Sequence, residues 1–310
     1  MNYNYYSNGK LLITAEYLVL DGAQALALPT KYGQNLEIKP FKEPKLIWES
    51  YTASNKLWLQ VEFDLPRLRV ISESFDSNTE GANDSAAIKL QDILFEAKKL
   101  NPDFLNDTKG YYIKSKLSFP RNWGLGSSST LINNIAQWAD IDAFQLQFST
   151  FGGSAYDIAC AQNNSPILYQ LKQRKPHVER VNFNPSFKEQ LYFVHLNKKQ
   201  NSREGIAKYQ NFKGNVSAFT EEISKLTNEI IECSTLSDFE KIIEEHERII
   251  ASIIKQTSIQ QELFSDYFGK IKSLGAWGGD FILATGNNDT LNYFKKKGFE
   301  TVIPYQAIIL

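Results

Sequence analysis

The sequence predicts two domains that each combine β-strands with α-helices. A chain of 310 residues is longer than one hydrophobic core usually supports. Apolar residues make up 42% of it and charged residues 22%, as is typical of globular proteins. Short aromatic or aliphatic runs alternate with segments whose apolar residues recur at helical spacing. Pro185 and polar neighbours interrupt the pattern at 184–188, so we expect domains at 1–187 and 188–310.

The expected elements follow in chain order. Strands are predicted where apolar or aromatic runs end at turn residues, and helices where apolar positions repeat every three or four residues. In the first domain we expect a strand or a strand and turn at 11–20, a hairpin at 46–63, a helix at 86–100, a strand at 110–119 and a helix from about Thr130. In the second we expect a strand at 191–196, helices within 215–254, a strand after the turn at 275–280, and a last strand in 299–310.

Charge and cysteine content exclude several classes of protein. Thirty-four Lys and Arg against 35 Asp and Glu give a net charge of −1, which argues against nucleic acid or an anionic membrane as a main partner. Two distant cysteines and three scattered histidines argue against a disulfide scaffold and a zinc site. With no signal-peptide pattern and no apolar segment of about 20 residues, we expect a cytoplasmic monomer or homodimer.

The segment 120–130, PRNWGLGSSST, lies between a predicted strand and a predicted helix. Its glycines let the backbone approach a ligand, and the amides at a helix N-terminus attract anions. The hydroxyl groups add donors and an oxygen ligand for Mg²⁺. Because GK[ST] is absent, the segment predicts a phosphate-binding loop other than a Walker A loop. The structural alternative is a flexible turn with a serine N-cap.

Three further segments carry candidate polar groups. Lys10, beside Gly9, either provides a fixed positive charge to a site or faces solvent, as most lysines do. Glu16 lies in an apolar run and therefore needs a partner or a position at an edge. Asp157, after two glycines, can accept a proton or pair with a lysine, although a helix N-cap is the simpler interpretation of this residue alone. The turn 275–280, GAWGGD, is a weaker candidate for a backbone approach to ligand.

Taken in order, these segments resemble the three motifs of the GHMP kinases, a superfamily that includes galactokinase, homoserine kinase, mevalonate kinase and phosphomevalonate kinase. Residues 120–129 match P-x-x-x-G-L-G-S-S-[AS] at every fixed position. The first motif resembles residues 8–22, NGKLLITAEYLVLDG, and the third resembles 275–280. GSAYDIA at 153–159 resembles the mevalonate and phosphomevalonate branch, specifically a bacterial subgroup with the signature GYDIA.

This resemblance spans nearly the whole chain and implies an α+β fold. It implies an N-terminal domain like domain 2 of ribosomal protein S5 and a ferredoxin-like C-terminal domain, with nucleotide and acceptor in the cleft between them. The implied reaction transfers the γ-phosphate of ATP to mevalonate or phosphomevalonate, in isoprenoid precursor synthesis. Lys10 would stabilise the transferring group, and Asp157 would orient or deprotonate an acceptor hydroxyl or, if the acceptor is a phosphate, hold Lys10.

The resemblance also implies the binding residues and cofactors, ATP and Mg²⁺. ATP would be bound by Gly124, Leu125, Gly126, Ser127, Ser128 and Ser129, with Ser128 as a Mg²⁺ ligand. The small anionic substrate would be bound by Glu16, Ser154, Lys199, Ser202, Gly278, Gly279 and Asp280. The basic loop 197–203 suits a carboxylate or phosphate on that substrate, and a solvated basic loop is the alternative.

Several positions depart from the family pattern. Asn8 replaces a usual proline, and Ala15, Ala155 and Trp277 replace usual glycines. Mevalonate kinases have a metal-binding glutamate near 145–147, where this chain has Gln-Leu-Gln. These differences leave two alternatives open: a GHMP kinase for a sugar or an amino-acid alcohol, and a catalytically silent binding or regulatory protein. The joint presence of Lys10, Ser128 and Asp157 argues against the silent protein.

Overall fold

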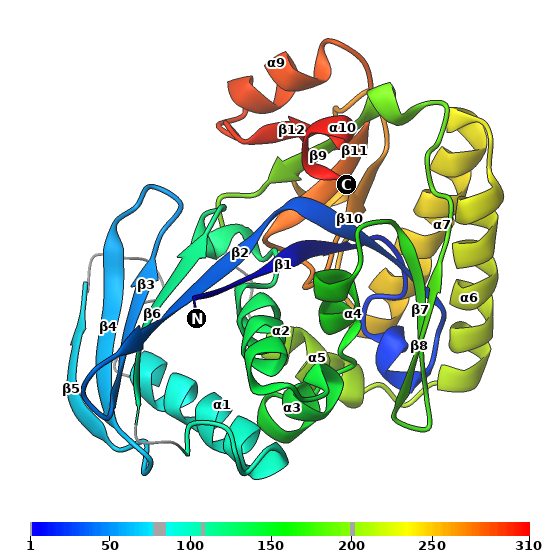
Figure 1. Cartoon of the computed structure of the whole chain (residues 1–310). Helices are drawn as coiled ribbons and strands as arrows, with labels where there is room; N and C mark the ends of the chain where they lie inside the picture. The colour runs from blue at the N-terminus through cyan, green and yellow to red at the C-terminus, as the bar shows by residue number, and fades with distance from the viewer. Residues whose placement is uncertain (1, 77–84, 107–108, 199–201) are drawn as a thin grey trace. The chain divides into compact units, whose positions relative to one another are not determined.

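The computed structural model describes residues 2–76, 85–106, 109–198 and 202–310, which group into two compact units (Figure 1). Unit 1 comprises the described residues up to Gly9 and from Tyr32 to Gln162, and unit 2 comprises Lys10–Lys31 and Asn163–Leu310. Each unit thus joins separate segments of the sequence, and the domain boundary at residue 187 stays a prediction. The first residues of strand β2 (Ala25–Phe41) pair with β7 (Ile167–Lys172), and this pairing joins two sequence segments in unit 2.

Unit 1 is built on a mixed β-sheet. Its strand order is β5-β4-β3-β6-β2, and β1 (Tyr3–Leu12) also pairs with β2. The bounds are β3 (Lys45–Tyr51), β4 (Leu57–Asp64), β5 (Val70–Phe75) and β6 (Gly110–Leu117). β3 and β6 are parallel, and the β2–β6, β3–β4 and β4–β5 pairs are antiparallel. Side chains alternate across a strand, so the aligned residues Ile38, Ile113 and Trp48 share one buried face.

Helices of unit 1 cover that buried face. They are α1 (Ser85–Leu100), α2 (Ser127–Ala139), α3 (Ala143–Thr150) and α4 (Tyr156–Gln162). Leu94 of α1 and Ile132 of α2 join the strand residues in one hydrophobic cluster. Each such side chain stabilises the fold by about 1.5–3 kcal/mol through burial.

Unit 2 contains a four-stranded antiparallel sheet of order β10-β11-β9-β12. These strands are β9 (Leu191–His195), β10 (Ile271–Ser273), β11 (Phe281–Thr285) and β12 (Val302–Pro304). Helices α6 (Val216–Glu232) and α7 (Leu236–Ile254) lie side by side (Figure 1), each begun by a side-chain cap, from Asn215 and Thr235 respectively. The unit also contains β8 (Lys175–Arg180), α5 (Ser202–Gln210), α8 (Ile259–Leu263), α9 (Thr290–Lys296), α10 (Tyr305–Ile308) and the 3-10 turns η1 (Leu18–Asp21) and η3 (Lys188–Gln190).

Most predicted elements are confirmed, and three differ. The hairpin at 46–63, the helix at 86–100, the strand at 110–119 and the helices within 215–254 are present. The strand expected at 11–20 begins at Tyr3 and ends at Leu12, because the backbone turns at Ala15 and Tyr17. Helix α2 begins at Ser127, three residues before the predicted start. The expected final strand is only Val302–Pro304 and leads into α10. Within the described residues, no helix has the length and apolar character needed to cross a bilayer.

Candidate active site

The glycine-rich segment of unit 1 forms a 3-10 turn (η2, Arg121–Trp123), a short loop and the start of α2. Gly124 and Gly126 have φ values of 66° and 89°, a left-handed conformation that glycine adopts without the steric cost of a Cβ. Gly126 is the N-cap of α2 and has no side chain with which to cap it. The first amides of the helix therefore lack intrahelical acceptors, and the helix dipole adds positive charge beside them. This geometry suits an anion such as a phosphate group.

Two hydroxyl groups of this segment form hydrogen bonds within the described part of unit 1, and two do not. Ser129 Oγ donates to Gly126 O at 2.9 Å, and Thr130 Oγ1 donates to Gln34 Oε1 at 2.6 Å, so both side chains hold the loop in place. Ser127 is half-buried and Ser128 is exposed, and neither hydroxyl has a hydrogen-bond partner among the described residues. Ser127 and Ser128 are therefore the hydroxyls available to a ligand.

A neutral polar network anchors α2 from within unit 1. Ser7 Oγ of β1 donates to Asn134 Oδ1 and accepts from Asn133 Nδ2, both at 2.8 Å. Asn134 Nδ2 donates to Gln34 O of β2 at 2.9 Å, and Gln162 Nε2 of α4 donates to Asn133 Oδ1 at 3.0 Å. Because buried amides are costly without partners, this network fixes α2 against β1, β2 and α4.

The segment that carries Asp157 is a second turn of unit 1. Gly152, Gly153 and Ala155 all have positive φ values, and Gln147 Nε2 donates to Gly152 O at 2.9 Å. The side-chain amide of Gln147 therefore supports this turn. Asp157 is half-buried in the first turn of α4 and accepts from the amide of Ile158 at 3.2 Å, so it is not the N-cap. Ser154 beside it is buried.

Arg121, at the start of the glycine-rich segment, stacks on an aromatic ring of unit 1. Its guanidinium carbon lies 3.4 Å from the centre of the Trp58 ring. Burial lowers the pKa of Arg121 to about 10, which leaves it positively charged at neutral pH. The stack therefore places a fixed cation next to Asn122 and the loop that follows.

In unit 2, the predicted residue Glu16 lies at the centre of a buried charged cluster. Lys272 Nζ of β10 donates to Glu16 Oε1 at 2.5 Å and lies 3.7 Å from Glu247 Oε1 of α7. His246 Nε2 accepts the amide of Ala15 at 2.9 Å, and Ser273 Oγ donates to Glu247 Oε2 at 3.1 Å. Both Glu16 and Lys272 are fully buried. The structure thus gives Glu16 a basic partner, and its contact with a substrate stays a prediction.

Burial sets the protonation of this cluster. It raises the pKa of Glu16, an effect that Lys272 opposes, and raises the pKa of Glu247 to about 8. Burial and the charge of Lys272 hold the pKa of His246 well below its usual value. A neutral His246 can accept the Ala15 amide, so its 3.4 Å approach to Glu16 Oε2 is not an ion pair. Glu247 therefore mostly keeps its proton at neutral pH, and Glu16 is the carboxyl group closest to Lys272 Nζ.

The third glycine-rich segment is the loop between β10 and β11. Gly278 has φ 90° and Asp280 has φ 52°. The Asp280 amide donates to Lys198 O at 2.7 Å, which places the loop beside this one lysine of the predicted basic segment. Trp277 is buried, and its amide donates to Tyr17 Oη at 3.3 Å.

Three other predicted site residues lie elsewhere in the chain. Lys10 is half-buried near the end of β1. Lys199 lies outside the described residues, and Ser202 begins α5, with its side chain outside the description.

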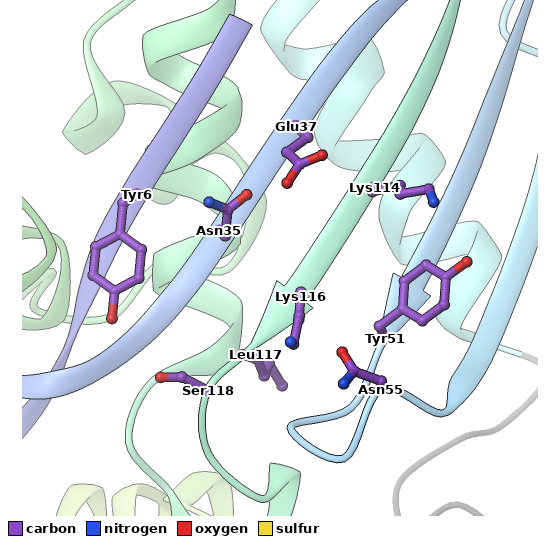
Figure 2. A pocket seen from close by; sticks show the side chains of 9 residues that line it. All are labelled: Tyr6, Asn35, Glu37, Tyr51, Asn55, Lys114, Lys116, Leu117 and Ser118. Carbon is purple, nitrogen blue, oxygen red and sulfur yellow. The ribbon is translucent and has the colours of Figure 1, made fainter.

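A separate groove lies on the other face of the unit 1 sheet and has a volume of about 470 Å³ (Figure 2). Tyr6 and Tyr51 stand at its sides, with Lys114 and Lys116 from β6 and Glu37 from β2 between them. The groove contains none of the predicted site residues. Its lining mixes both charges and is open to solvent, so it does not specify a ligand.

Solved structures of GHMP kinases share the fold of this chain over nearly its whole length. The mevalonate kinase of Methanococcus jannaschii matches with a TM-score of 0.70 and 16% identity, over 97% of this chain and 96% of that chain. The phosphomevalonate kinase of Streptococcus pneumoniae, in complex with phosphomevalonate and AMPPNP, matches with a TM-score of 0.66 and 16% identity, over 99% and 98%. The galactokinase of Lactococcus lactis, complexed with galactose, matches with a TM-score of 0.66 and 12% identity, over 96% and 88%.

These matches confirm the predicted two-domain α+β fold of the GHMP kinases. No protein-family model matches the sequence, and no curated protein matches it. At identities of 12–16% the likeness shows the fold, while the printed names of the matching kinases cover three different acceptors.

Sequence reasoning missed the residues that hold these segments in place. Lys272 lies two residues after another lysine, Lys270, and has no distinguishing sequence pattern. His246 and Glu247 lie in a highly charged helix, where solvent exposure is the ordinary expectation. Two signals were available: Glu16 in an apolar run, and Asn133-Asn134, two adjacent amides between apolar residues of α2.

Proposed function

We propose that the protein is an ATP-dependent small-molecule kinase that transfers the γ-phosphate to mevalonate or phosphomevalonate. The observation that carries this proposal is the loop of Gly124 and Gly126, whose left-handed residues lead into the uncapped start of α2. The fold shared with kinases for three acceptors supports phosphoryl transfer, and the basic segment beside Asp280 favours an anionic acceptor.

The described residues offer several groups to the phosphates of ATP and one candidate ligand to Mg²⁺. The amides at the start of α2 and the open hydroxyls of Ser127 and Ser128 suit phosphate oxygens. Ser128 can also provide one oxygen to Mg²⁺, and the described residues contain no group of three His, Cys, Asp or Glu side chains arranged for a metal. Bound Mg²⁺ would supply charge neutralisation on the phosphates, and it commonly keeps several waters as ligands.

In this proposal the reaction breaks the bond between the γ-phosphorus and the bridging oxygen of ADP and forms a bond to an acceptor oxygen. Lys10 stabilises charge on the transferring group. If the acceptor is a hydroxyl, Asp157 orients it and takes its proton; if the acceptor is a phosphate, no proton needs to move. Catalysis is then mainly positioning and electrostatic stabilisation.

ADP release measured with Mg-ATP against mevalonate, phosphomevalonate, galactose and homoserine tests the proposal. We expect turnover with one of the first two. Turnover with galactose or homoserine only would show that the proposed acceptor is wrong and that the protein is a kinase for a sugar or an amino-acid alcohol. Binding of ATP without turnover of any acceptor would favour a catalytically silent binding protein.

Single substitutions then test the assigned roles. Lys10→Ala and Asp157→Asn should each lower kcat by about a hundred- to a thousand-fold, the usual loss for one stabilising group, with little change in melting temperature. Lys116→Ala, in the groove that neither of these residues lines, is the control and should keep full turnover. Full turnover in a folded Lys10 or Asp157 variant would contradict the corresponding role.

A further inference from the structure

Two neighbouring residues of unit 2 hold the glycine-rich loop 274–280 at separate points. Glu16 binds Lys272, which lies in β10 just before the loop. The next residue, Tyr17, accepts the amide of Trp277 inside the loop at 3.3 Å. Both contacts lie within unit 2, and together they connect the 15–17 turn to the segment that carries Gly278, Gly279 and Asp280.

The 15–17 turn itself depends on its contacts. Ala15 and Tyr17 have φ values of 67° and 65°, and each non-glycine residue in this region costs roughly 1–2 kcal/mol. The Ala15 amide is held by His246, and the Tyr17 ring stacks on Tyr209 with centres 5.9 Å apart. Such a conformation persists only where the surroundings determine it.

Tyr17 also contacts the helix that follows the predicted acceptor loop. A Cβ added at Gly205 of α5 would lie 2.4 Å from Tyr17 Oη, so the helix backbone packs directly on this ring. The 15–17 turn therefore contacts α5 on one side and loop 274–280 on the other.

We propose that Glu16, Tyr17 and Lys272 are positioning residues that set the conformation of loop 274–280 for the acceptor. This inference rests on the proposed function, because it assigns Gly278, Gly279 and Asp280 to the acceptor side. It gives Glu16 an indirect role: a fully buried carboxylate paired with Lys272 acts through the loop. Lys272 pairs with Glu16 in preference to Glu247: its Nζ lies 2.5 Å from Glu16 Oε1 and 3.7 Å from Glu247 Oε1.

The test compares two isosteric variants of the same cluster. Glu16→Gln removes the charged anchor of the turn, while Glu247→Gln changes the more distant carboxylate. In the full-length protein we expect Glu16→Gln to raise the KM for the acceptor at least tenfold, with the KM for ATP within twofold of the original. Glu247→Gln should leave both constants within twofold.

Amide hydrogen exchange provides a readout that needs no substrate. Peptides covering 274–280 should exchange faster in Glu16→Gln than in Glu247→Gln, while peptides of α2 should not change. The double variant Glu16→Gln/Lys272→Met should have the same acceptor KM as Glu16→Gln, because the two residues act as one unit. Tyr17→Phe loses only the hydroxyl that accepts the Trp277 amide. This variant tests the proposal if the other variants do not fold, and it should also raise the KM for the acceptor.

Three outcomes would overturn the inference: an unchanged acceptor KM in folded Glu16→Gln and Tyr17→Phe, equal rises of both KM values, or unchanged exchange of loop 274–280. Failure of the proposed function is distinguishable from these. If the unaltered protein turns over no acceptor, the proposed kinase function is wrong. The exchange data would still show whether Glu16, Tyr17 and Lys272 hold loop 274–280 in place.

Discussion

The glycine-rich segment of unit 1 and the 15–17 turn of unit 2 both hold residues at positive φ, but by different means. Unit 1 uses glycine at 124 and 126 and anchors the following helix with neutral amides and hydroxyls. Unit 2 uses Ala15 and Tyr17 and anchors the turn with a buried ion pair and a neutral histidine. Glycine makes the conformation accessible at 124 and 126, whereas the 15–17 turn depends on its buried partners, which include the charged pair. We therefore expect unit 2 to respond more strongly to substitution and pH.

Removing the buried cation should produce the largest difference between the units. Lys272→Met leaves Glu16 buried without its partner, which typically costs about 3–5 kcal/mol. Urea unfolding measures this change. Lys270→Met, two residues earlier and paired with Glu244 at an exposed site, is the matched control and should cost less than about 1 kcal/mol. Equal losses in the two variants would show that burial of the pair is unimportant.

The pH dependence of stability should also arise in unit 2. Burial raises the pKa of Glu247 to about 8, so the folded protein keeps a proton that the unfolded chain releases above its ordinary pKa near 4.5. The stability contributed by this proton is therefore present at low pH and lost as the pH rises through about 8. Glu247→Gln stays neutral, so it should become more stable than the original chain as pH increases from 5 to 8, by at most about 1.4 kcal/mol per pH unit. Parallel stability curves would contradict the raised pKa.

A substitution in the neutral network of unit 1 should be costly but insensitive to pH. Asn134→Ala leaves Ser7 Oγ and Gln34 O without this partner and should cost about 1–3 kcal/mol. The same loss is expected at pH 5 and pH 8, because no titratable group takes part in these bonds. Asn106→Ala, at an exposed site, is the control. A loss that varies strongly with pH would mean that the contrast between the units is wrong.

Restoring the glycine usual in the family should have the smallest effect. Ala155 is buried with φ 61°, so Ala155→Gly relieves backbone strain while removing one methyl group. We expect a change in unfolding free energy within about 1 kcal/mol of zero. Ala97→Gly, in the last turn of α1 and equally buried, has no strain to relieve and should cost more than about 1 kcal/mol. Similar losses at the two sites would show that residue 155 is not strained.

Local patterns were sufficient to predict much of this fold. Apolar periodicity placed α1, α6 and α7, and the aromatic runs around 52–55 placed the β3–β4 hairpin. They were insufficient for β2, a strand of 17 residues that contains Pro29, Gly33 and Pro40. Those residues disfavour strands locally, and pairing with partners on both sides outweighs that preference.

The sequence by itself determined the composition of the candidate site: a glycine-rich loop before a helix, a lysine after a glycine, and an aspartate after a glycine turn. These are local features, because the conformations that glycine permits and the amides exposed at a helix start depend on adjacent residues. Only the tertiary structure decided which polar groups are buried and with what partners. Glu16 and Lys272 are 256 positions apart, and their pairing follows from the packing of β10 and α7 against the 15–17 turn, which no local pattern encodes.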